Sequence, residues 1–150
     1  MTYLICIDDT DMPGTKGTGW LVQEMCELMT VKGMGYASPI SRHQLFVHED
    51  VPFTSHNSAM CVEWAPGESI GMDGLISFMA GYLEDRAEKG SDPGLCVAGL
   101  DRGLDASRLI AFGRSAKEQI RTKRQAYDLA RETGIHLSEH GGTGDGVVEL

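Results

Sequence analysis

The 150-residue sequence predicts a single compact α/β domain, spanning residues 1–150, with a mixed β-sheet and packed helices. Short apolar segments that end in turn residues, which is typical of buried strands, alternate along the chain with segments whose apolar residues recur at helical spacing. The chain is long enough for one hydrophobic core, and it contains no internal repeat and no linker-like segment that would divide it.

The first strand is predicted over Tyr3–Asp8, because this segment is short, apolar and followed by turn residues. A helix is expected from residue 18 or 19 to residue 32, with Leu21, Met25 and Met29 on one face and a glycine-rich end. The same criteria predict strands over 40–47 and 59–64, a helix over 74–90, a turn and strand within 91–100, helices over 105–112 and 115–134, and a strand over 135–140.

The composition is that of a globular protein, with 41% hydrophobic and 23% charged residues. A net charge of −9 argues against direct nucleic-acid binding without a partner, because neutralising phosphates requires a basic surface. There is no signal-peptide pattern and no apolar run of membrane-spanning length, so we expect a cytoplasmic protein that does not contact a membrane. A homo-oligomer is compatible with this composition.

The four cysteines, Cys6, Cys26, Cys61 and Cys96, are isolated from one another in apolar segments. Because none forms a C-x-x-C pair, we expect buried thiols in a reducing compartment and neither a zinc site nor a disulfide framework.

Three carboxylates follow the first strand, in the sequence IDDTD of residues 7–11. Asp8, Asp9 and Asp11 repel one another unless a cation lies between them, and their hard oxygen ligands suit magnesium. The next loop contains Lys16 and the sequence Gly17-Thr18-Gly19 at a predicted helix start, where backbone N–H groups bind phosphate well. The sequence therefore predicts adjoining metal and phosphate sites. The alternative is an acidic turn in which Asp11 or Thr18 only caps the helix.

A second candidate phosphate loop is GGTGDG, which consists of Gly141, Gly142, Thr143, Gly144, Asp145 and Gly146. Its glycines leave backbone N–H groups able to surround an anion. The alternative is a flexible C-terminal tail. The chain continues for only four residues after this loop, so either it ends there naturally or a following helix has been lost.

A polar loop between two predicted strands is a candidate substrate site, formed by Thr54, Ser55, His56, Asn57 and Ser58. His56 suits a general base or a phosphate partner, although most such loops are only solvated turns. The segments 42–44 and 90–94 are expected to be an exposed strand edge and an ordinary turn, respectively.

In this order, IDDTD, the Gly-Thr-Gly helix start, TSHNS and GGTGDG make the chain resemble a known family. It is similar to the N-terminal catalytic part of archaeal tRNA-isoleucine agmatinylcytidine synthetases, and more closely to short uncharacterised proteins that share IDDTD, TSHNS, GSDPGLC and GGTGDG. The synthetases bind ATP and magnesium, phosphorylate the wobble cytidine and then let agmatine displace the phosphate.

The resemblance implies that Asp8, Asp9 and Asp11 bind metal and phosphate, that Thr18 accepts phosphate, and that residues 141–146 hold the triphosphate. Nothing here corresponds to the oligonucleotide-binding fold and zinc ribbon with which the synthetases hold tRNA, so tRNA modification is not carried over.

The leading hypothesis is a magnesium-dependent, ATP-using phosphotransferase with Asp9 and Thr18 as catalytic residues, acting on a small molecule or nucleoside. The alternative is a non-catalytic nucleotide- or anion-binding module that works with a partner protein.

Overall fold

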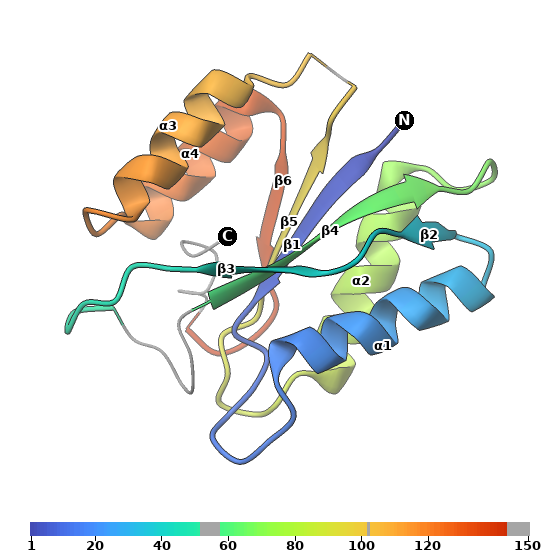
Figure 1. Ribbon diagram of the computed structural model, residues 1–150, viewed down its shortest axis with the longest axis horizontal. Helices are drawn as coiled ribbons and strands as arrows, with labels where there is room; N and C mark the ends of the chain where they lie inside the picture. Colours follow the sequence, from blue (N-terminus) through green and yellow to red (C-terminus); the bar gives the residue numbers. More distant parts are fainter. Residues whose placement is uncertain (52–57, 102, 144–150) are drawn as a thin grey trace.

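The computed structural model describes residues 1–51, 58–101 and 103–143, and within them the chain alternates between strands and helices (Figure 1). The elements are β1 (Tyr3–Asp8), α1 (Thr18–Val31), β2 (Gly35–Ala37), β3 (Ser41–Gln44), β4 (Ser58–Pro66), α2 (Met72–Arg86), β5 (Gly94–Gly99), α3 (Ala106–Ala116), α4 (Lys123–Thr133) and β6 (His136–Glu139). The predicted α/β class is confirmed.

The strands form one six-stranded sheet in the order β2-β4-β1-β5-β6, and β3 also pairs with β4. Every pairing among the described strands is antiparallel, whereas the alternation of elements predicted a mixed sheet. The difference arises because β1 occupies the centre and pairs with β4 and β5, which both run opposite to it. Local hydrophobic patterns do not encode which strands become neighbours.

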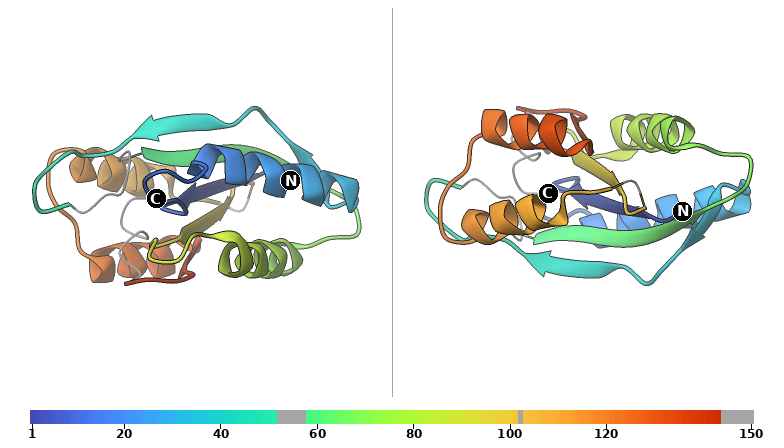
Figure 2. Two further views of the ribbon diagram at one scale, coloured as in Figure 1. Left: turned by 90° about the horizontal axis from the view of Figure 1, so that it is seen from below. Right: turned by 90° about the horizontal axis from the view of Figure 1, so that it is seen from above.

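Helices lie on both faces of the sheet (Figure 2). In the view from above, α1 and α2 are on one side of the strands, and α3 and α4 are on the other. The main core lies between the sheet and the first pair of helices. Its fully buried side chains include Tyr3, Ile5 and Ile7 of β1, Met25 and Met29 of α1, and Leu75, Met79 and Leu83 of α2. This arrangement confirms the predicted apolar stripe of the first helix.

The α3–α4 hairpin replaces the continuous helix predicted over 115–134. Thr122 ends the preceding loop and forms a capping box with Gln125, so a new helix begins at Lys123. No side chain of α3 is buried. The predicted periodicity was therefore correct for α4 but was extended through the interhelical turn.

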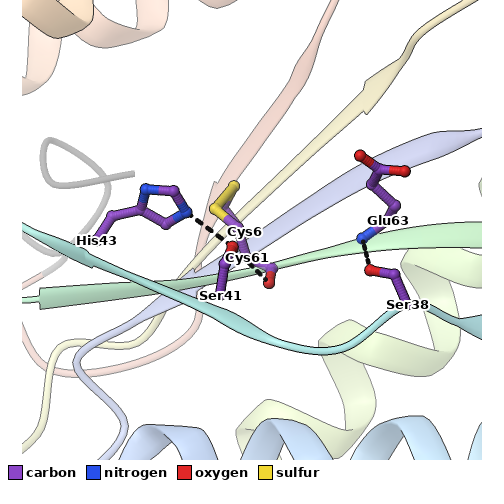
Figure 3. The surroundings of a disulfide bond; sticks show 6 residues. All are labelled: Cys6, Ser38, Ser41, His43, Cys61 and Glu63. Carbon is purple, nitrogen blue, oxygen red and sulfur yellow. Dashed lines mark hydrogen bonds between the residues drawn. A yellow bond between two sulfur atoms is a disulfide. The ribbon is translucent and has the colours of Figure 1, made fainter.

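The cysteine prediction is wrong for one pair, because Cys6 and Cys61 form a disulfide. They lie directly opposite each other on β1 and β4, 55 residues apart in sequence. Figure 3 shows the disulfide beside Ser41 and His43 of β3. Cys26 and Cys96 are free thiols, as predicted. Spacing along the chain gave no sign of the pair, since only the strand register brings the two sulfurs together.

Crossing a membrane requires a helix that is both long enough and apolar enough. None in the described residues meets both requirements.

Candidate functional site

The acidic motif forms the turn that leaves the central strand. Asp8 is the last residue of β1 and is only 3% exposed, and its Oδ1 accepts a hydrogen bond of 2.7 Å from the Asp9 backbone N–H. Asp9 has φ of 53°, the left-handed region, and it is the only non-glycine residue in the described part of the chain with positive φ. Asp is among the few residue types that tolerate this conformation. The left-handed conformation therefore occurs directly after the buried strand.

A buried hydroxyl ties this turn to the start of α1. Thr18 Oγ1 accepts hydrogen bonds from the Thr10 backbone N–H at 3.3 Å and from Thr10 Oγ1 at 3.0 Å, and it donates to Asp11 Oδ1 at 3.3 Å. Thr10 is 1% and Thr18 is 6% exposed. The hydroxyl thus joins three groups, of which the two from Thr10 belong to a buried residue and the third, the Asp11 carboxylate, is half-buried.

This arrangement corrects the capping alternative. The N-cap of α1 is Gly17, and no side chain caps it. Thr18 is the first helical residue, and its hydroxyl points back to the acidic turn rather than to the N–H groups of its own helix.

Lys16 and Trp20 lie on the exposed side of the same helix start. The Lys16 ammonium lies 3.8 Å from the centre of the Trp20 ring, which is a cation–π contact, and Trp20 is 48% exposed. The positively charged Lys16 side chain therefore lies next to Gly17 to Gly19, the predicted phosphate-binding loop.

The connection between α2 and β5 forms the next part of this end of the sheet. The Glu88 backbone N–H donates to Thr10 O at 3.0 Å, and Gly94 at the start of β5 pairs with Asp8. Ser91, which is 2% exposed, donates through its hydroxyl to Glu88 O at 2.6 Å. Figure 1 shows both loops at the lower end of the sheet.

The beginning of the glycine-rich segment docks on this connection. Thr143 donates to the Asp92 carboxylate through its backbone N–H and, at 2.7 Å, through its hydroxyl. Gly142 has φ of 56°, and a Cβ there would overlap Asp92 Oδ1 and Ser91 O. The segment 141–143 therefore lies at the same end of the sheet as the acidic turn. The remaining residues of the predicted loop, 144–146, lie outside the described residues.

Sequence reasoning missed the residues that connect these segments. The segment 90–94 was predicted to be an ordinary turn, yet its Asp92 holds Thr143, and Thr10 was not singled out. Arg42, expected on a merely exposed strand, donates through Nε to the hydroxyl of buried Ser58 at 2.9 Å. No local signal would have identified these contacts, because each joins positions far apart in sequence.

Of the predicted substrate loop, only its last residue, Ser58, lies within the described residues. Ser58 begins β4 and is 5% exposed, whereas Thr54, Ser55, His56 and Asn57 lie outside the described residues.

The acidic motif does not form a complete metal site by itself. Within the described residues, no three His, Cys, Asp or Glu side chains are gathered closely enough to hold a metal ion. Asp8, Asp9 and Asp11 therefore do not form a preassembled three-carboxylate site. The donor set fits an ion such as magnesium, which typically uses one or two carboxylates and completes its shell with substrate phosphates and water.

Known proteins resemble this chain in their fold. No protein-family model and no curated protein sequence matches the chain. Solved structures do match. A tRNA fluorescent labelling enzyme superposes with a TM-score of 0.79 at 17% identity, and apo TiaS, an agmatidine synthetase for an isoleucine tRNA, with 0.78 at 16%.

The complex of TiaS with this tRNA and ATP gives a TM-score of 0.78 at 18% identity. The folds are alike over nearly the whole chain. The superposition covers 99% of this chain but only 34% of each of these three proteins. At this identity the likeness shows the fold, and the predicted resemblance to the synthetases is supported at that level.

Proposed function

We propose that this protein binds ATP with magnesium at the acidic-turn end of the sheet and transfers a phosphoryl group to a small molecule or nucleoside. Fold-level support comes from the TiaS structures, one solved with tRNA and ATP and another with tRNA, AMPCPP and agmatine. Because this chain spans about a third of those proteins, their tRNA substrate is not part of the proposal.

The observation that carries the proposal is the meeting of two remote polar segments. The 88–94 connection touches Thr10 on one side and residues 142–143 on the other, so it brings the start of the glycine-rich loop to the end of the sheet that bears the acidic turn. A triphosphate needs backbone donors, a cation and metal-binding carboxylates within one small region. This end of the sheet offers all three types of group.

The proposed roles follow from this placement. Lys16 and the backbone of Gly17 to Gly19 would contact phosphates, together with residues 141–146. Asp8 and Asp9 would hold magnesium, which when bound neutralises phosphate charge. Residues 54–58 would contact the phosphate acceptor.

Thr18 is the least favourable of the proposed catalytic residues. Thr18 is 6% exposed, and its hydroxyl has three hydrogen-bonding partners, all of which it would lose on turning toward a γ-phosphate. This burial favours direct transfer to the small-molecule acceptor. It equally favours the second candidate function, a nucleotide-binding module without turnover.

Asp9→Asn gives the sharpest binding test. Asn adopts positive φ about as readily as Asp, so the variant removes the charge without straining the turn. Isothermal titration with ATP and magnesium should detect binding by the wild type and a loss of at least about tenfold in Asp9→Asn. The matched control is Asp73→Asn, an exposed position in the first turn of α2.

Turnover is then followed as ADP release in the presence of candidate acceptors, and intact-mass analysis reports any phosphate on the protein. If ATP binds but no ADP is released, the result supports the second candidate function, a nucleotide-binding module without turnover. Absence of binding at millimolar ATP, or equal losses in both Asp variants, would refute the proposed site.

A further inference from the structure

Side chains of β6 and of His140, the residue that follows it, form a continuous hydrogen-bonded chain that the proposed ATP site does not use. Ser138 Oγ lies 2.8 Å from His136 Nε2 and 2.7 Å from His140 Nε2. His140 Nδ1 in turn lies 3.0 Å from Glu84 Oε1 of α2. His136 and Ser138 share the sheet face toward α2, because they pair with the core residues Val97 and Leu95.

The chemistry of these groups fixes the direction of the protons. A carboxylate only accepts, so in the neutral form of His140 the proton is on Nδ1 and is donated to Glu84, which leaves Nε2 as an acceptor for the Ser138 hydroxyl. Burial, followed by the charge of His140, lowers the pKa of His136, and Asp73 partly opposes this effect. A neutral His136 that donates from Nε2 to Ser138 Oγ directs the hydroxyl proton toward His140.

The order of groups is that of an activated nucleophile, with a hydroxyl, an imidazole that accepts its proton and a carboxylate that orients the imidazole. We propose that Ser138 is a nucleophile toward carboxylic esters and similar activated acyl groups, with His140 as its general base and Glu84 as a positioning residue. The His140 side chain is 7% exposed, whereas Ser138 is only half-buried, so the base is shielded and the nucleophile can be reached.

β6 also provides access for a substrate, because it is the last strand on its side of the sheet. An acyl compound can approach Ser138 along this edge without displacing another of the described strands.

The reaction balances without a redox partner. Ser138 Oγ bonds to the acyl carbon as its proton passes to His140 Nε2, and the alkoxide leaves with that proton. Water then attacks the acyl-serine by the same proton transfer, releasing the carboxylic acid and restoring the hydroxyl.

The chain contains a matched internal control. Ser41 Oγ lies 2.8 Å from His43 Nε2 on exposed β3, a comparable Ser–His contact, and the Ser41 hydroxyl also donates to Cys61 O at 3.3 Å (Figure 3). In the part of the chain that the structure describes, no carboxylate contacts His43. If a Ser–His contact were sufficient for activation, Ser41 would react as Ser138 does.

The test uses an alkyl fluorophosphonate, in which serine attack breaks the P–F bond and releases fluoride with the hydroxyl proton. Intact-mass analysis and peptide mapping should find one adduct, on Ser138 and not on Ser41. Ser138→Ala should abolish it, and Glu84→Gln should slow labelling at least about tenfold, as expected for loss of an oriented base.

Glu84→Asp, which retains the carboxylate, should label at a rate within about threefold of the wild-type rate. Thermal unfolding of each variant checks that the fold is kept. The proposal is overturned if Ser138 is not labelled, if Ser41 is labelled equally, or if Glu84→Gln labels like the wild type. None of these results depends on ATP binding.

Discussion

Replacing Thr18 by valine tests whether its hydroxyl holds the acidic turn. Valine has nearly the same shape, so the change removes the hydroxyl while keeping the packing of the first turn of α1. The Thr10 backbone N–H and hydroxyl and the Asp11 carboxylate each lose one partner. Asp11 is half-buried and can recruit water, and the Thr10 hydroxyl can rotate, so the principal cost is the buried Thr10 N–H.

Leaving one buried donor unsatisfied costs about 1–3 kcal/mol, and we expect Thr18→Val to lower the free energy of unfolding by about 2 kcal/mol. For a chain of this length the loss corresponds to a fall in Tm of about 4–8 °C. Urea unfolding followed by circular dichroism measures it. Thr18→Ser keeps the hydroxyl and removes one methyl group, so it should cost less than about 1 kcal/mol.

A double-mutant cycle with Thr10→Val isolates the contact, because the two side chains should show a coupling energy above about 0.5 kcal/mol. If Thr18→Val unfolds within about 0.5 kcal/mol of the wild type, or costs no more than Thr18→Ser, the turn does not depend on this hydroxyl and the reasoning is wrong.

Three further predictions concern other parts of the molecule. The Cys6 disulfide closes 55 residues, so reductant should lower the free energy of unfolding by about 4 kcal/mol in urea titrations, and Cys6→Ser should abolish this response. Burial raises the pKa of the partly exposed Cys96 thiol to about 12, so a maleimide at pH 7 should modify it much more slowly in the folded protein than after unfolding; equal rates would contradict the raised pKa. The lowered pKa of His136 means that the folded state binds fewer protons than the unfolded state between that pKa and about 6.5. Stability should therefore fall as pH drops through this window, and His136→Gln should reduce the fall in chemical unfolding measured at several pH values.

The sequence by itself determined the elements whose patterns are strong and local. The apolar segment before Asp8 defined β1 over Tyr3–Asp8, and the stripe of Leu21, Met25 and Met29 defined α1 to within a residue or two. Weak local patterns were less informative. The short strand Gly35–Ala37 was missed, because three residues between a helix end and a proline carry no periodicity.

The polar character of the site could likewise be predicted from IDDTD and the glycine-rich segments, because the sequence itself gives the chemistry of each side chain. The contacts that join the segments of the site could not be predicted from the sequence. Asp92 receives Thr143 from 51 residues away, and Thr10 O receives the Glu88 N–H from the far side of α2.

Only the tertiary structure decided which positions oppose each other across the strands. Cys6 on the central strand faces Cys61 on one side and Cys96 on the other, and the register, rather than the spacing of the cysteines, sets this row. The same holds for Ser138 of β6 and His140 just after it, which meet each other two residues apart but meet Glu84 of α2 only in the folded chain. Local sequence specifies periodicity and turn chemistry through interactions of neighbouring residues. Pairing and helix placement depend on burying the whole apolar surface at once, so they emerge only when the complete chain folds.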